Sequence, residues 1–141
     1  MTAPRRPPLG LQINRSSRDI GRAFGEALAS AGGSHPMWMI MITLKSGNGR
    51  NQQELAESVG IRGATLSHHL NALESDGLVT RRRDPDNRRV HIVELTEDGE
   101  DRFHELRAAA AGFDRRLRRG ISADDLTRFS ATLQRLRDNV A

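Results

Sequence analysis

Five arginines stand close together in the stretch RRRDPDNRRV, which runs from Arg81 to Val90. A guanidinium carries a permanent positive charge and a planar fork of N–H donors that matches phosphate oxygens and guanine edges. The DPDN centre has the residue types of a tight turn, which would bring the two arginine groups together. The stretch therefore predicts either a surface that contacts an anionic partner or a solvated hairpin whose edge is guarded by charge.

A second group of polar residues lies just before this stretch, in a segment with helical periodicity from about Arg62 to Asp76. Leu66, Leu70 and Leu73 share one face of that helix, which should be buried, with His69 partly buried beside them. The opposite face and its margins carry mostly small or planar polar side chains, which suit close approach to the edges of bases: Thr65, Ser67, His68, Asn71, Ala72 and Ser75.

Arg62 stands at or near the cap of the same helix, where a cation opposes the helix dipole. A phosphate bound nearby would compensate for this unfavourable interaction. The alternative is that Arg62 is a surface arginine without a role.

The elements that position these residues can be read from the spacing of apolar residues and from breakers. Helices are expected over about 9–31, 36–45, 51–60, 62–76, 96–119 and 122–140, and strands over 78–83 and 89–95. Pro85 excludes a helix running through the arginine-rich stretch. The order of helix, tight turn, helix and β-hairpin is that of a helix-turn-helix followed by a wing, in a mainly α chain with a small β-wing.

Four residues predict where the later helices begin. Asn51 can cap the third helix, with Glu54 closing a capping-box-like pair. Thr96 can cap the fifth helix and Ser122 the last. Pro36 suits the opening turn of the second helix, PMWMIMITLK, which is apolar nearly all round and should be buried on most sides.

The last two helices repeat apolar residues at alternating spacings of three and four, a pattern that favours packing against other helices. A chain of this length offers few partners internally, so we expect the first and last helices to form a dimer layer; an intramolecular bundle is the alternative. The residues expected in that layer are Ile20, Phe113, Leu117, Leu126, Phe129, Leu133 and Leu136.

Composition limits the remaining possibilities. The 141 residues carry a formal charge of +4, and Lys45 is the only lysine among 22 basic residues. An arginine excess suits an anionic partner, although a GC-rich genome would produce the same bias. The absence of cysteine excludes disulfides and fits a reducing cytoplasm. Residues 1–8 lack the apolar core of a signal peptide and are expected to form a flexible basic arm, with residues 9–141 as one domain.

Enzyme and metal chemistry find little support in the residue pattern. The chain has no G-x-S-x-G elbow, Walker loop or H-E-x-x-H motif, and no cofactor is expected. The adjacent His68 and His69 point about 100° apart on a helix and cannot easily share one ion. The other histidines are scattered, so no metal site is predicted.

The motifs ELAESVGI, ATLSHHLNALESDGLV and VELTEDG, with the arginine-rich wing between the last two, resemble the MarR family of winged helix-turn-helix transcription regulators. The likeness covers nearly the whole chain. It implies a cytoplasmic homodimer that represses transcription by binding a pseudo-palindromic double-stranded operator. It also implies that the wing enters the minor groove through an Asp-x-Arg pair, which falls here on Asn87 and Arg89.

Asparagine at this position is a departure from the family, because an amide cannot form a charge-assisted pair. Asp86 is a possible substitute in aiming the wing. Arg89 is expected in the minor groove, while Arg88 and one or more of the arginines at 81–83, Arg81 foremost, contact phosphates.

The family resemblance further implies a small, often aromatic ligand bound between the dimer layer and the winged domain. Phe24, Trp38, Met39 and Met41 are the expected lining, although a stripe of such residues is also typical of an ordinary core. The alternative to DNA binding is a helical protein-interaction module on the same scaffold.

Overall fold

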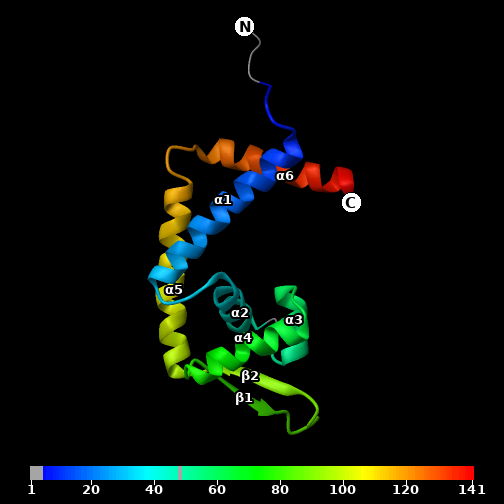
Figure 1. Ribbon diagram of the computed structural model, residues 1–141, viewed down its shortest axis with the longest axis vertical. Helices are drawn as coiled ribbons and strands as arrows, with labels where there is room; N and C mark the ends of the chain where they lie inside the picture. Colours follow the sequence, from blue (N-terminus) through cyan, green and yellow to red (C-terminus); the bar gives the residue numbers. More distant parts are fainter. Residues whose placement is uncertain (1–4, 48) are drawn as a thin grey trace. The chain divides into compact units, whose positions relative to one another are not determined.

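The computed structural model of the protein describes residues 5–47 and 49–141. Its elements are α1 (Leu9–Ser30), α2 (His35–Ser46), α3 (Gln52–Val59), α4 (Gly63–Ser75), β1 (Val79–Arg83), β2 (His91–Leu95), α5 (Glu97–Leu117) and α6 (Ala123–Val140) (Figure 1). The mainly helical fold with one small antiparallel sheet confirms the predicted fold class. Part of the predicted basic arm, residues 1–4, lies outside the described residues.

The chain divides into two compact units at Ala111 and Gly112, within α5. The first unit contains α1 to α4, the sheet and most of α5. The second contains the end of α5 and α6. The predicted helix-turn-helix and the predicted wing therefore belong to one unit and can be described together. No helix in the described ranges is long and apolar enough to span a membrane.

The first helix of the predicted helix-turn-helix is α3, and it begins where the sequence indicates. The Asn51 side chain accepts a hydrogen bond from the Glu54 N–H at 2.8 Å. The Glu54 carboxylate accepts from the N–H of Arg50 at 3.2 Å, one residue earlier than a capping box requires. Gly60, with φ of 79°, ends the helix.

The three leucines that the sequence predicts to be buried determine which face of α4 packs on the core. Leu66, Leu70 and Leu73 are all buried, as the sequence predicts. They join one hydrophobic core with residues from every other element of the first unit, including Leu28, Ile40, Met41, Leu55, Val93 and Leu106. Because α4 buries this one face, its opposite face is largely exposed.

A tight junction joins α4 to the wing. Gly77 adopts a φ of +74°, which allows the Leu78 N–H to bond back to the Leu73 carbonyl at 2.9 Å. The Leu78 carbonyl then accepts from the Thr96 N–H at 3.0 Å. The Thr96 hydroxyl donates to the Gly77 carbonyl at 2.6 Å and accepts from the Gly99 N–H at 3.0 Å, so Thr96 caps α5 as predicted.

The strands pair in antiparallel register from Val79 opposite Leu95 to Arg83 opposite His91. The expected second strand, which included residues 89 and 90, is wrong at its start. The Val90 N–H donates to the Asn87 carbonyl at 2.9 Å, and the Val90 carbonyl accepts from the Asp84 N–H at 2.8 Å. These bonds close a longer loop at the wing tip, so strand pairing begins only at His91.

The apolar second helix, α2, is half to fully buried over most of its length, as predicted. Its start is one residue earlier than expected, since the Ser34 side chain accepts from the Met37 N–H at 3.3 Å. Trp38 stacks on Phe103 of α5, with ring centroids 5.6 Å apart and an interplanar angle of 13°. This contact ties α2 to the first turns of α5.

The second unit begins its last helix at the predicted cap, where the Ser122 hydroxyl accepts from the Asp125 N–H at 3.1 Å. In this single chain α6 buries no residue fully. Phe129 is 61 % exposed, while Leu126, Leu133 and Leu136 are half-buried. In one copy of the chain, these apolar side chains therefore remain partly exposed to solvent.

Among the glycines of the described residues, Gly99 leaves the least room for a side chain. A Cβ added there would lie only 2.0 Å from the Leu78 carbonyl oxygen. Gly99→Ala should therefore lower the free energy of unfolding by about 1–3 kcal/mol, the usual cost of overpacking. Chemical denaturation measures this. Gly63→Ala, where nothing lies within 4 Å of the added Cβ, is the control and should not destabilise; equal stability of the two variants would contradict the packing argument.

Candidate nucleic-acid interface

The exposed face of α4 carries the polar residues that the sequence indicates. Thr65, His68 and Asn71 are exposed, whereas Ser67 and His69 are half-buried at the edge of the face. The rings of His68 and His69 meet edge to face at 5.7 Å. The half-buried position of His69 and the exposure of His68 agree with the prediction, and the polar face is free of large apolar side chains.

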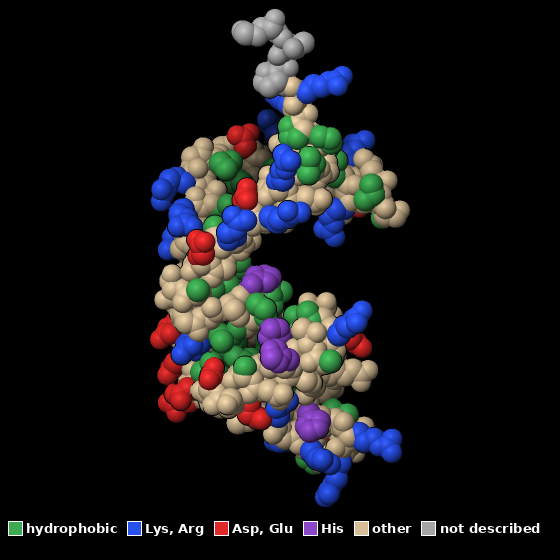
Figure 2. All heavy atoms as spheres, in the orientation of Figure 1, with side chains coloured by type: hydrophobic (Ala, Val, Ile, Leu, Met, Phe, Trp, Pro, Cys, Tyr) green, Lys and Arg blue, Asp and Glu red, His purple; other side chains and the backbone are tan. Residues whose placement is uncertain are grey.

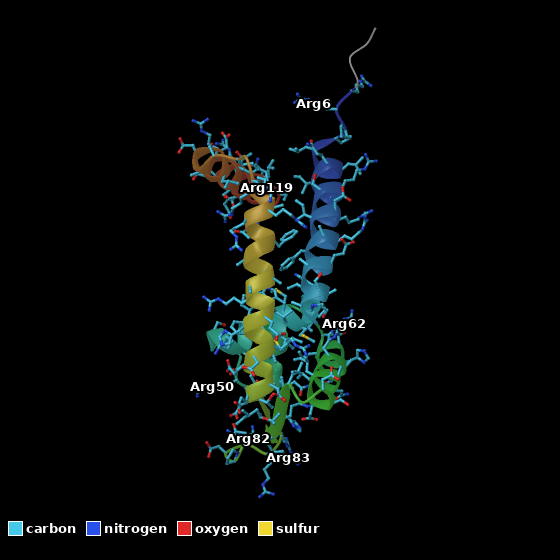
Figure 3. The ribbon with its side chains drawn as sticks, turned by 90° about the vertical axis from the view of Figure 1, so that its left-hand side faces the viewer. Arg6, Arg50, Arg62, Arg82, Arg83 and Arg119 are labelled. Carbon is cyan, nitrogen blue, oxygen red and sulfur yellow. The ribbon has the colours of Figure 1, made fainter. Side chains whose placement is uncertain are left out.

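The start of α4 is open. Arg62 is the N-cap residue, is exposed, and makes no side-chain capping hydrogen bond among the described residues. Gly63 follows with nothing within 4 Å of an added Cβ. Figure 3 shows Arg62 beside the start of this helix, away from Arg82 and Arg83 of the wing. Uncapped N–H groups at a helix start favour an anion, and a neighbouring guanidinium adds to that preference.

Ser67 is positioned by a residue that sequence reasoning missed. The Gln52 side-chain amide, at the first position of α3, donates to the Ser67 hydroxyl oxygen at 2.5 Å. Because the oxygen accepts this bond, the serine hydroxyl hydrogen is free to point elsewhere. A glutamine in the first turn of one helix and a serine 15 residues later give no local sequence signal, so only the fold reveals the pair.

Four of the five wing arginines are exposed, and one of these four forms an ion pair. Figure 2 shows Lys and Arg side chains gathered over the end of the unit where the β-hairpin lies. Arg83, Arg88 and Arg89 are exposed. Arg82 is also exposed but pairs with Glu94 of β2 at 3.0 Å. An exposed ion pair of this kind contributes little to stability.

The wing tip is shaped by two side chains that accept from backbone N–H groups. The Asn87 amide oxygen accepts from the Arg89 N–H at 3.2 Å. The Asp84 carboxylate accepts from the Asp86 N–H at 2.9 Å. Asn87 therefore orients the Arg89 backbone, and Asp84, which the sequence reasoning did not single out, shapes the other half of the turn.

Arg81 differs from the other wing arginines because it is bound to α4. Its backbone N–H donates to Glu74 at 3.2 Å, and its guanidinium Nε and Nη2 donate to the same carboxylate at 3.4 and 3.1 Å. Nη2 also donates to the Asn71 amide oxygen at 2.5 Å. Only 19 % of the Arg81 side chain is exposed. The structure thus places Arg81 between helix and wing, whereas the sequence predicts it on a phosphate.

The contact with Arg81 changes the pKa of the Glu74 carboxyl. Its hydrogen bond with the Arg81 side chain holds the pKa of its carboxyl below the ordinary value of 4.5, with the charge of Arg81 adding to the effect. His91 makes a small contribution of the same sign. The carboxylate is therefore firmly ionised at neutral pH.

A hollow of about 660 Å³ brings several of these residues together. Ser67 of α4, Arg81 of β1 and Arg89 of the wing tip all line it, with Gly63 and His91. The hollow lies between the helix-turn-helix and the wing. His91 was not among the predicted DNA contacts, because its place in a strand gave no sign that it would face this space.

The four residues expected to line a ligand pocket lie mainly in the core. Met41 is fully buried and Trp38 is 8 % exposed. Met39 and Phe24 are half-buried, and Phe24 meets the ring of His35 at 5.8 Å. Neither the hollow above nor a second one of about 920 Å³ beside Lys45, Arg50 and Glu94 is lined by any of the four. In the described part of the chain, no three His, Asp or Glu side chains cluster in a way that could hold a metal ion.

Comparison with known proteins identifies the family. The MarR family model matches residues 34–91. Over 129 residues the chain is 30 % identical to the uncharacterized HTH-type transcriptional regulator YdgJ of Bacillus subtilis, covering 92 % of this chain and 77 % of that protein. The chain belongs to the MarR family. It is therefore a MarR-family transcription regulator with the winged-helix DNA-binding fold.

Solved structures support the same fold. The transcriptional repressor CouR, bound to a 23-mer DNA duplex, superposes with a TM-score of 0.83 at 27 % identity, and the match covers 92 % of both chains. The PcaV regulator of Streptomyces coelicolor, in complex with its natural ligand, matches with a TM-score of 0.78 at 20 % identity over 98 % of this chain and all of that one. The second likeness concerns the MarR fold alone.

The contact between Arg81 and Glu74 predicts a measurable change in pKa. Folding lowers the pKa of Glu74, so its contribution to stability is complete above the unfolded-state pKa and is lost as the pH falls through the lower folded-state value. Arg81→Gln should raise the Glu74 pKa towards its ordinary value of 4.5. A carboxyl-detected NMR titration measures it. Arg82→Gln is the matched control, and a Glu74 pKa that is the same in both variants would argue against the contact.

Proposed function

We propose that the protein is a homodimeric repressor that binds a pseudo-palindromic operator in double-stranded DNA. Each copy places α4 in a major groove and its wing against the adjacent minor groove. The observation that carries this proposal is the joint exposure of the polar face of α4 and the arginine-rich wing tip on one compact unit. Membership of the MarR family supports it.

The hollow between α4 and the wing suits the sugar–phosphate strand that separates the two grooves. Arg89 and His91 line it from the wing, and Ser67 lines it from α4. A phosphate there would meet the Ser67 hydroxyl and the His91 imidazole, which fix the register of the protein without reading sequence. Arg62 and the open first turn of α4 would hold a second phosphate.

The wing arginines then take different roles. Arg89 enters the minor groove, where narrow A·T-rich segments concentrate negative potential. Arg88 and Arg83 contact phosphates, since both are exposed. Direct base contacts come from Thr65, His68 and Asn71 on α4.

The homodimer is supported by the apolar residues that one copy leaves exposed. Ile20 is 43 % and Leu117 44 % exposed, and Phe129 is more exposed still. Side chains of this size along long helices favour helical partners. A second copy of the chain supplies such partners with the correct pattern.

A small effector remains part of the proposal, as the ligand-bound PcaV suggests for this fold. Trp38 and Phe103 form a stacked aromatic pair within the core against which Met39 and Phe24 also pack, and an aromatic ligand would pack well there after a modest rearrangement. In the present conformation these side chains fill the space themselves.

Salt dependence of DNA binding tests the main proposal. Each phosphate contact releases counterions, so affinity for the DNA upstream of the gene should fall steeply as salt rises, by about 10³-fold or more between 50 and 200 mM for six or more contacts. Fluorescence anisotropy with labelled duplexes measures this. A flat salt response without preference for any duplex would instead favour a protein-interaction module.

Two alanine variants sharpen this test. Arg89→Ala should weaken operator binding about five- to hundredfold, because it removes a groove contact. Arg107→Ala removes the same charge from an exposed position on α5 and serves as the matched control. Equal affinity of the two variants would remove Arg89 from the interface.

Sedimentation equilibrium tests the dimer separately. The protein should behave as a particle of twice the 15.6 kDa chain mass at micromolar concentration. Replacing the 61 % exposed Phe129 by Asp should shift the equilibrium to monomer, since burying an unpaired charge is costly. A wild-type monomer at this concentration would rule out the terminal-helix dimer layer.

A further inference from the structure

The contact between the wing and α4 runs through a residue that is expected to read bases. Asn71 lies on the exposed face of α4, and Glu74 follows one turn later on the same side of the helix. Arg81 reaches both from β1, and one nitrogen, Nη2, contacts the Asn71 amide oxygen at 2.5 Å and the Glu74 carboxylate at 3.1 Å. The three side chains form a connected group, which we term the Asn71–Glu74–Arg81 clamp.

The chemistry of Arg81 decides which way the Asn71 amide faces. A guanidinium has only N–H donors, so the amide atom that meets it has to be the oxygen. The amide nitrogen with its two hydrogens then points away from Arg81. Rotation of the amide by 180° would set N–H groups against N–H groups next to a positive charge, and this orientation is strongly disfavoured.

Glu74 keeps Arg81 in place for this task. Three hydrogen bonds from the Arg81 backbone and side chain end on the Glu74 carboxylate. A two-point contact with a carboxylate fixes the plane of the guanidinium, which a single bond does not. It also engages a cation that would otherwise be drawn to a nearby phosphate.

We propose that Glu74, acting through Arg81, fixes the amide of Asn71 as a hydrogen-bond donor towards DNA and so helps to set the base preference of the protein. Glu74 is a positioning residue, because the reading atom is the Asn71 amide nitrogen. This inference rests on the proposed function and deepens it by naming what Asn71 recognises.

A fixed donor has a definite preference among bases. In the major groove guanine presents two acceptors, O6 and N7, and thymine presents O4, whereas cytosine presents the N4 donor. An asparagine that is free to flip can instead pair with adenine through both its donor and its acceptor. With its oxygen held by Arg81, Asn71 should favour guanine or thymine at one position of each half-site and disfavour cytosine.

The test compares Glu74→Gln with Glu94→Gln. Both variants remove one negative charge that is paired with a wing arginine, but Glu94 pairs with Arg82 and does not contact α4 among the described contacts. Affinity is measured for a set of duplexes in which every operator position is changed to each base pair. In Glu74→Gln the preference should fall about three- to tenfold at one symmetric pair of positions. In Glu94→Gln the profile should match wild type.

Two further variants keep the proposal falsifiable if Glu74→Gln loses stability. Arg81→Lys retains the charge but not the fork, and it should flatten the preference at the same positions. Asn71→Asp retains an acceptor for Arg81 but replaces the outward donor by an acceptor, so the preference there should shift towards cytosine or adenine. Circular dichroism melting of each variant confirms that the compared proteins are folded.

The outcomes separate the inference from the proposed function. If wild type prefers one operator but Glu74→Gln weakens all duplexes alike or leaves the profile unchanged, the positioning role is wrong and the proposed function stands. If Asn71→Asp leaves the base preference unaltered, Asn71 does not read that position and the inference fails. If wild type shows no preference among duplexes, the proposed function fails first.

Discussion

The hydrogen bond from the Thr96 N–H to the Leu78 carbonyl is the contact on which the geometry of the interface depends. It joins the end of β2 to the residue that leaves α4, and the Thr96 hydroxyl adds bonds to Gly77 and Gly99 at the same point. The carbonyl can be reached only because Gly99 has no side chain. α4, the wing and α5 are thereby held at one junction, so a change in the direction of any of them must disturb the other two.

Beyond this junction, arginines with the same chemistry perform different tasks. The Arg82 pair with Glu94 is exposed on both sides, and water and salt screen such pairs strongly. Arg81 is mostly covered and is held by several hydrogen bonds. The position of its guanidinium is therefore fixed by directional hydrogen bonds more than by net charge. Arg83, Arg88 and Arg89 stay exposed. Position relative to α4, and not residue type, separates the arginine that organises the surface from those available to DNA.

The sequence predicts the parts of this structure that depend on local patterns. Leucine spacing identifies the buried face of α4, and Asn51, Thr96 and Ser122 mark helix starts because capping needs only neighbours in the chain. Contacts between distant segments are not predictable in this way. Strand alternation places Arg81 and Arg82 on opposite faces of β1, but the sequence does not show that the Arg81 face meets α4, because that contact arises only when β1 packs beside the end of α4. The apolar, β-branched side chain of Val90 favours a strand, yet the hydrogen bonds of the wing tip override that propensity.

The asparagine at the wing tip illustrates how function can tolerate a departure from the family pattern. If residue 87 had to hold the guanidinium of Arg89, loss of a carboxylate would remove a charge-assisted bond. The observed partner is the Arg89 backbone N–H, for which a neutral amide oxygen is a competent acceptor. An aspartate could close the same turn, but it would place a third carboxylate in the tip beside Asp84 and Asp86. Against a phosphate backbone that charge would be repelled, so the amide keeps the shape of the turn while leaving the charge of Arg89 less compensated.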